Sequence, residues 1–104
     1  MVRMFAAVTL PSLPRARHYE GLPDSPHRRE LPRPTVALID ETREGFYLIR
    51  LTDDGTFCDD TWHPSADEAR GQAEFEFDRV GTWHQIPAQV ADPRSYAIQH
   101  VKTG

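Results

Sequence analysis

The sequence contains a single cysteine, Cys58, and no long hydrophobic run. One cysteine cannot form a disulfide within the chain, and small secreted domains commonly depend on such cross-links. No window approaches the roughly 18 apolar residues that a membrane-spanning helix needs. The apolar opening runs into Pro11 and Pro14 without a clean signal-peptide cleavage site. These absences favour a cytoplasmic protein without a membrane partner.

The chain also lacks the spacings of catalytic, cofactor and metal signatures. It has no glycine-rich phosphate loop, nucleophile elbow or dinucleotide fingerprint. Paired His-x-x-x-His and Cys-x-x-Cys ligands are missing as well. The neighbours of Cys58 are Asp59 and Asp60, whose charges raise the pKa of a thiol and make it less reactive. We therefore expect no cofactor, and enzymatic activity is the less favoured interpretation.

Charge is divided unevenly along the chain. Residues 1–34 carry six Arg against three acids, a net +3, whereas residues 35–104 carry six basic and thirteen acidic residues, a net −7. Non-specific affinity for nucleic acids comes mostly from Lys and Arg that neutralise backbone phosphates. An acidic body therefore argues against a nucleic-acid partner, and we expect a protein partner or a second copy of the chain.

Proline dominates the N-terminal third, with six prolines between positions 11 and 34. Each proline removes a hydrogen-bond donor and restricts the residue before it, so helix and sheet are both disfavoured. We predict an extended or disordered arm over residues 1–34, followed by one small α+β domain over residues 35–104. Residues 2–10 are compatible with a short strand, and the alternative is an extension that does not pack.

The body alternates between strand-like runs and turn residues. Asp53-Asp54-Gly55 is typical of a tight turn rather than of a calcium loop, because the other oxygen ligands of such a loop are missing. Phe46 to Thr52 carries apolar groups on both of its faces. The expected strands are Val36–Asp40, Phe46–Thr52, Thr56–His63 and Thr82–Ile86.

One main helix is predicted over Ala66–Arg79. Ser65 and Glu68 have the spacing of a capping box, and Gly81 stands where a left-handed terminating residue is typical. A shared stripe for packing on the sheet is formed by Ala66, Ala69, Ala73, Phe77 and Val80.

Asp92 followed by Pro93 then predicts a short C-terminal helix from Asp92 to Val101, and a strand over 96–101 is the alternative. The fold class is therefore α+β, in the order β-β-β-α-β, with a mostly antiparallel sheet of about four strands.

Two groups of residues are candidates for function. The first is a polar cluster of imidazoles and carboxylates, the groups that a divalent metal or an acid–base pair requires: Asp59, Asp60, His63 and His84. Strand alternation places Asp60 opposite Asp59 and His63, so at most two of these three converge without help from elsewhere. The cluster would support a small hydrolase or a metal-dependent enzyme, and the alternative is that its residues are solvated or packed.

The second candidate is an interaction surface around Phe75. This residue lies about 200° around the helix from Ala73, away from the alanine stripe. We expect the ring to be covered by the N-terminal arm, the C-terminal helix or a second copy. The predicted surface consists of Phe75, Gly71, Gln72, Phe46 and Leu48, and it favours an interaction or regulatory module that self-associates.

The segments GFYLIR, DDG, DTWH, EA and QAEFE, at positions 45–50, 53–55, 60–63, 68–69 and 72–76, carry a resemblance. Together they resemble a group of short bacterial hypothetical proteins. The resemblance covers residues 45–86 and implies a compact α+β core. That group has no assigned activity, so the resemblance transfers no functional residue.

Overall fold

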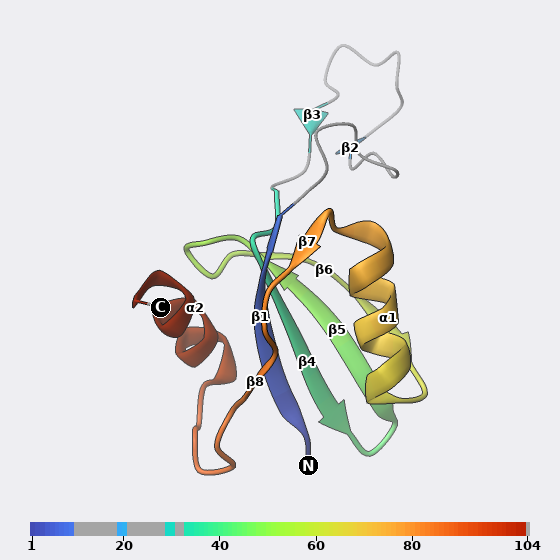
Figure 1. Ribbon diagram of the computed structural model, residues 1–104, viewed down its shortest axis with the longest axis vertical. Helices are drawn as coiled ribbons and strands as arrows, with labels where there is room; N and C mark the ends of the chain where they lie inside the picture. The colour runs from blue at the N-terminus through green and yellow to red at the C-terminus, as the bar shows by residue number, and fades with distance from the viewer. Residues whose placement is uncertain (10–18, 21–28, 31–32, 104) are drawn as a thin grey trace.

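The computed structural model describes residues 1–9, 19–20, 29–30 and 33–103, and its main feature is one antiparallel sheet. Strands β1 (Arg3–Thr9), β4 (Val36–Thr42), β5 (Gly45–Leu51) and β6 (Phe57–His63) lie in the order β6-β5-β4-β1 (Figure 1). Two short strands, β7 (Arg79–Val80) and β8 (His84–Gln85), pair with the outer edge of β1. The predicted α+β class and antiparallel sheet are confirmed.

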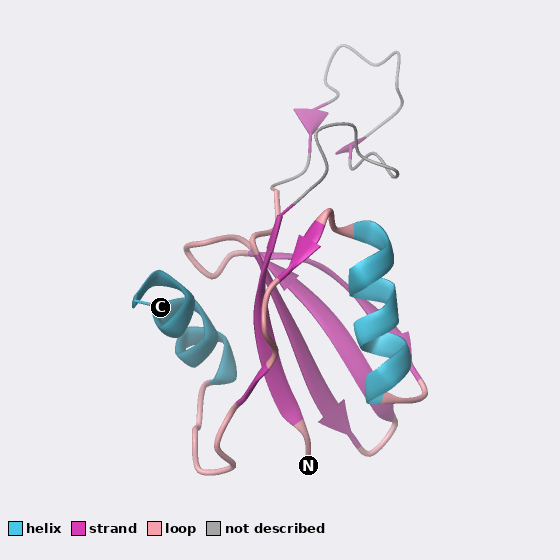
Figure 2. Cartoon of the chain, viewed as in Figure 1, coloured by secondary structure: helices cyan, strands magenta, loops and turns pink. Residues whose placement is uncertain are grey.

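Each face of this sheet is covered by one helix. Helix α1 (Ala66–Glu76) packs on one face and α2 (Pro93–Thr103) on the other, so the sheet lies between them (Figure 2). Successive strand residues alternate between the two cores, as Met4 and Phe5 show. The apolar groups on both faces of β5 are explained in the same way, because Leu48 and Ile49 enter different cores.

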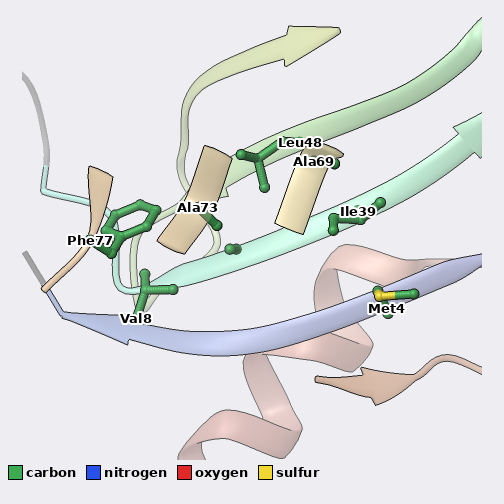
Figure 3. Close-up of a cluster of buried hydrophobic side chains, with 8 residues drawn as sticks. Met4, Val8, Ile39, Leu48, Ala69, Ala73 and Phe77 are labelled. Carbon is green, nitrogen blue, oxygen red and sulfur yellow. The ribbon is translucent and has the colours of Figure 1, made fainter. Parts of the chain in front are cut away.

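The core under α1 depends on the small side chains of the helix. Ala69 and Ala73 are fully buried against the sheet, and Phe77 lies over Val8 at the end of β1 (Figure 3). Small residues allow a helix to approach a sheet closely. The predicted stripe is therefore confirmed for Ala69, Ala73 and Phe77, whereas Ala66 is not part of this core and Val80 packs against it from β7 rather than from the helix.

The start of α1 agrees with the sequence, but its end does not. Ser65 Oγ accepts a hydrogen bond from the Glu68 amide at 3.1 Å. The helix ends at Glu76 rather than Arg79, because the Asp78 amide bonds to the Thr9 carbonyl at 2.8 Å and the chain joins the sheet. Sheet pairing replaces the last helical turn that the sequence predicts.

Gly81 is not the helix terminator that the sequence predicts. Its amide donates to the Ala7 carbonyl at 2.8 Å, within the edge that pairs with β1. A Cβ at this position would lie 3.3 Å from the same carbonyl oxygen, so glycine permits the close approach of two backbones. The role of Gly81 is therefore set by a strand at the other end of the chain.

The N-terminal region differs most from expectation. Residues Arg3–Thr9 form β1 inside the sheet, so the domain includes a strand that lies outside the expected boundary at residue 35. Within the expected arm, β2 (Tyr19–Glu20) and β3 (Arg29–Glu30) form a short antiparallel ladder. Residues 10–18, 21–28 and 31–32 of that arm lie outside the described residues.

The structure also decides the form of the last predicted strand and of the C-terminal segment. Thr82–Ile86 is reduced to the two residues of β8, preceded by the separate strand β7. Asp92 caps α2 by accepting hydrogen bonds from the amides of Arg94 and Ser95, which excludes the alternative strand over 96–101. No helix in the described part of the chain is long and apolar enough to cross a membrane.

Gly45, where the hairpin between β4 and β5 turns, lies close to the side chain of Trp62 on β6. Gly45 has a φ of +135°, and an added Cβ would lie 2.5 Å from Trp62 Nε1. The indole N–H donates to the Glu44 carbonyl at 2.8 Å. Trp62 is therefore held across the hairpin while about half of its surface stays exposed.

We predict that Gly45→Ala destabilises the protein by about 1–3 kcal/mol, because the substitution meets both a strained backbone and a clash. Gly71→Ala is the matched control, since nothing lies within 4 Å of its added Cβ on the exposed side of α1. That control should gain about 0.5–1 kcal/mol from helix propensity. Urea denaturation measures both, and equal stability of Gly45→Ala and the parent would contradict the role of Gly45.

Candidate functional site

The four residues of the predicted polar cluster do not meet. Asp59 and His63 lie on the face of β6 that α1 covers, and Asp60 lies on the other face, opposite Ile49. His84 lies on β8, and the strands β5, β4 and β1 separate it from β6, a distance of about 19 Å at the usual strand spacing. In the described part of the chain, no group of three or more His, Cys, Asp or Glu is placed to hold a metal ion.

Asp59 takes part in an ion-pair network around Arg50. The Arg50 side chain is only 3% exposed, and its Nη1 lies 3.2 Å from Asp59 Oδ1. On the other side, Glu76 accepts from Arg50 Nε and Nη2, the latter at 2.9 Å. Two paired hydrogen bonds of this kind are the strongest arrangement of guanidinium and carboxylate. The network therefore joins β5, β6 and the last turn of α1.

Further polar groups complete this network. Arg50 Nη2 donates to Thr61 Oγ1 at 3.2 Å, and Gln72 Nε2 donates to Glu76 Oε2 at 2.8 Å. Burial alone would lower the pKa of Arg50, but hydrogen bonding to Glu76 and the charges of Glu76 and Asp59 hold that pKa above its usual value. The guanidinium thus stays charged, and the geometry is that of a structural clamp.

The remaining acidic and thiol candidates are also structural. Burial raises the pKa of Cys58, and Asp59 raises it further, as the sequence predicts for an unreactive thiol. Asp54 accepts hydrogen bonds from Thr52 Oγ1, the Thr56 amide and Thr56 Oγ1. These bonds stabilise the ionised carboxylate and lower the pKa of Asp54 to about 2. Its role is therefore to form the turn.

The predicted interaction surface is only partly at the surface. Phe75 is 66% exposed and points away from the sheet, and Gly71 is exposed on the same side. Gln72 is half-buried and bonded to Glu76. Phe46 is half-buried against the core. Leu48 is fully buried beneath α1, so it does not belong to the predicted interaction surface.

The outer face of α1 is acidic around Phe75. Glu68 stands seven residues before Phe75 and Gly71 four before it, so both share its side of the helix. Asp67 and Glu74 are exposed on the flank. We call the set Asp67, Glu68, Gly71, Glu74 and Phe75 the acidic helix face. A flat aromatic ring bordered by carboxylates is suited to contact with a cationic side chain.

A second pair of exposed aromatic residues lies on the edge strand β6. Phe57 and Trp62 are each close to half exposed, and both were missed as surface candidates. The Arg94 guanidinium from α2 lies 5.5 Å from the centre of the Phe57 ring. Strict alternation would place Phe57 and Trp62 on opposite faces of the strand, so no local pattern marked them as a pair; a register shift between Arg50 and Leu51 interrupts the alternation before Phe57.

We predict that Glu76→Ala lowers the stability of the protein by about 3 kcal/mol, because it leaves the buried guanidinium of Arg50 with the partly exposed Asp59 as its remaining carboxylate partner. Glu74→Ala, an exposed change in the same turn of α1, should alter stability by no more than about 0.5 kcal/mol. Chemical denaturation at neutral pH compares the two. Equal effects would show that the network does not anchor the helix.

A second prediction concerns Asp54. Because its folded-state pKa lies below the unfolded value, its contribution to stability is present above about pH 3.8 and is lost as the pH falls through about 2. A carboxyl-carbon NMR titration should give a midpoint near 2 for Asp54. The variants Thr52→Val and Thr56→Val should each raise that midpoint, and an unchanged midpoint would contradict the assigned hydrogen bonds.

Comparison with known proteins adds no functional assignment. No family model matches the chain, and no curated protein or solved structure matches it. Function must therefore be argued from the surfaces of this molecule alone.

Proposed function

We propose that this protein is an interaction module that self-associates through the acidic helix face. The observation that carries the proposal is the 66% exposure of Phe75 among carboxylates, on the side of α1 opposite its buried stripe. Full burial of a Phe side chain contributes about 1.5–3 kcal/mol. A contact that covers the exposed part of the Phe75 ring gains a share of this free energy.

The chemistry of the face selects a basic occupant. An arginine can stack on an aromatic ring while its guanidinium bonds to nearby carboxylates. Residues 11–34 combine six prolines with Arg15, Arg17, Arg28, Arg29 and Arg33. We therefore assign residues 11–34 of a second copy as the occupant.

The alternative modes of self-association are disfavoured by charge. Two acidic helix faces in direct contact would bring Glu68 and Glu74 of both copies together. A two-fold antiparallel pairing of two β6 strands about their centre would place Asp60 opposite Asp60. A positively charged segment against an acidic helix avoids both kinds of repulsion.

The end of β1 is compatible with reciprocal exchange. Strand β1 ends at Thr9, whose carbonyl accepts from the Asp78 amide just beyond α1. The last described residue of β1 therefore lies beside the C-terminal end of α1, the helix that carries Phe75 (Figure 1). A two-fold dimer about this end of the molecule would bring the chain after Thr9 of each copy toward the acidic helix face of the other.

The enzymatic alternative has little support. A hydrolase or metal enzyme built on Asp59, Asp60, His63 and His84 requires these side chains to converge, but they lie on two faces and opposite edges of the sheet. Asp59 is already paired with Arg50.

We predict that the protein is a dimer at about 50 mM salt and that Phe75→Glu makes it a monomer with unchanged circular dichroism. The substitution adds a charge to the contact and leaves Ala69, Ala73 and Phe77 in place. Dimerisation should also weaken at about 500 mM salt, because ionic screening shortens the reach of the charges. Phe57→Glu, on the opposite side of the sheet, is the matched control and should remain dimeric. Sedimentation velocity reports each state, and a monomeric parent at low salt would refute self-association.

A mixing experiment tests which segment occupies the face. The variant with Arg15, Arg17, Arg28 and Arg29 all changed to Gln keeps its acidic helix face, whereas Phe75→Glu keeps its basic segment. Each variant alone should be monomeric, and their mixture should form a heterodimer through one contact. A dimeric glutamine variant, or the absence of a heterodimer, would exclude exchange of residues 11–34.

A further inference from the structure

A cleft of about 300 Å³ lies at the C-terminal end of α1, where the chain turns from the helix into β7 (Figure 1). We call it the Trp83 cleft, and its lining residues are Glu74, Phe77, Asp78, Val80, Gly81 and Trp83. The amides of Asp78 and Gly81 donate to the carbonyls of Thr9 and Ala7, at 2.8 Å each. The cleft is therefore fixed beside the end of β1, and through Glu74 it continues the acidic helix face.

An extra residue in the edge strand places Trp83 on the same side of the sheet as α1. Val80 lies opposite Val8, but His84 lies opposite Phe5, so four steps along the edge correspond to three along β1. The extra residue reverses the alternation of side chains, as a β-bulge does. Val80 and Trp83 consequently both pack against the core under α1. Bulges occur often beside functional sites, where they redirect a side chain.

The indole of Trp83 offers the cleft an apolar ring surface rather than a hydrogen bond. The residue is half-buried. Its Nε1 is buried and has no hydrogen-bond partner in the described part of the chain, so the accessible part of the side chain is its ring carbons. The face of an indole attracts a cation more strongly than that of any other aromatic side chain.

Two carboxylates lie beside this ring. Glu74 and Asp78 are both exposed, and among the described residues neither side chain is engaged in a hydrogen bond or ion pair. Arg79 is adjacent in sequence, but Val80 packs against the core under α1, so alternation along β7 directs Arg79 to the other face. The described lining thus combines two negative charges with an aromatic surface and contains no Lys or Arg.

This combination selects arginine over lysine. A guanidinium is planar, so it can stack on the Trp83 ring while its N–H groups fork toward carboxylates in the same plane. The ammonium of lysine is a compact point charge that keeps its hydration and has no plane to stack. The requirement for a flat cation is stricter than the general attraction of an acidic surface for basic residues.

The sequence distinguishes two groups of arginines in residues 11–34. Arg15 and Arg17 have no acidic residue among their immediate neighbours, whereas Arg28 and Arg29 are followed directly by Glu30. Arg15 is six residues beyond Thr9, and six residues span up to about 20 Å. The first group is therefore both the more strongly cationic and close enough in sequence to cross from the end of β1 to a neighbouring copy.

We propose that the Trp83 cleft is the specificity pocket of the self-association interface and binds an arginine side chain of the Arg15–Arg17 pair from the second copy. The guanidinium lies between Glu74 and Asp78, with its plane against Trp83. This inference rests on the proposed self-association. It adds Asp78 and Trp83 to the contact and requires arginine where the acidic helix face alone requires only positive charge.

The first test keeps the charge and removes the planar fork. Arg15→Lys combined with Arg17→Lys should raise the dimer dissociation constant at about 50 mM salt at least about fivefold, because lysine cannot stack and fork at once. Arg28→Lys combined with Arg29→Lys is the matched control and should dimerise like the parent. Sedimentation velocity over a concentration series measures both. Equal dimerisation of the two lysine variants would overturn the pocket and leave self-association standing.

The second test does not need a dimer. A capped peptide of residues 12–18 is titrated into the variant with Arg15, Arg17, Arg28 and Arg29 changed to Gln, which keeps the cleft. Ring carbon–proton NMR signals of Trp83 should shift with saturation, and those of Trp62, on the α2 side of the sheet, should not move. The same peptide with citrulline at positions 15 and 17 keeps the shape without the charge and should not bind.

A charge-matched pair of variants assigns the carboxylate. In the same glutamine background, Asp78→Asn should weaken peptide binding about fivefold, the scale of one exposed ion pair, whereas Asp60→Asn, an equal charge change on the α2 side, should not alter it. Saturable binding without any parent dimer would uphold the arginine pocket and refute only the exchange between copies. Binding of the citrulline peptide, or equal effects of the two Asn variants, would overturn the pocket.

Discussion

Strand β1 is the element on which both hydrophobic cores depend. Its Met4 and Val8 side chains enter the core under α1, and its Phe5 side chain enters the core under α2. On one edge it pairs with β4, and on the other its carbonyls accept hydrogen bonds from residues 78, 81 and 86. Without β1, the segment after α1 would have no strand to pair with, and each core would lose buried side chains.

The packing of α1 determines which of its side chains reaches the surface. Arg50 holds Glu76 against β5 and β6, while Ala73 and Phe77 are buried on the sheet. With these three positions directed inward, Phe75 must point outward, because successive helical residues turn by about 100°. The buried ion pair thus orients the acidic helix face as well as anchoring the helix, which connects the stability of the fold to the proposed contact.

Features that depend on a few neighbouring residues were predictable. Ser65 caps α1 and Asp92 caps α2 through bonds that span three residues, and the alanine stripe follows from helical periodicity alone. The outward direction of Phe75 follows from the same periodicity. The four residues of the polar cluster do not converge, because His84 lies on β8 at the opposite edge of the sheet from β6.

Local hydrogen-bonding chemistry and side-chain periodicity therefore determined from the sequence the class of the fold, the main helix, the turn at Asp54 and the exposed position of Phe75. Only the tertiary structure decided that β1 lies inside the sheet, that α1 ends at Glu76, and that His84 pairs with Phe5 at the opposite edge of the sheet from β6. These features depend on pairing between residues about 30 to 80 positions apart, such as Arg3 with Asp40 and Phe5 with His84. No local pattern encodes where the partner strand of such a pair lies.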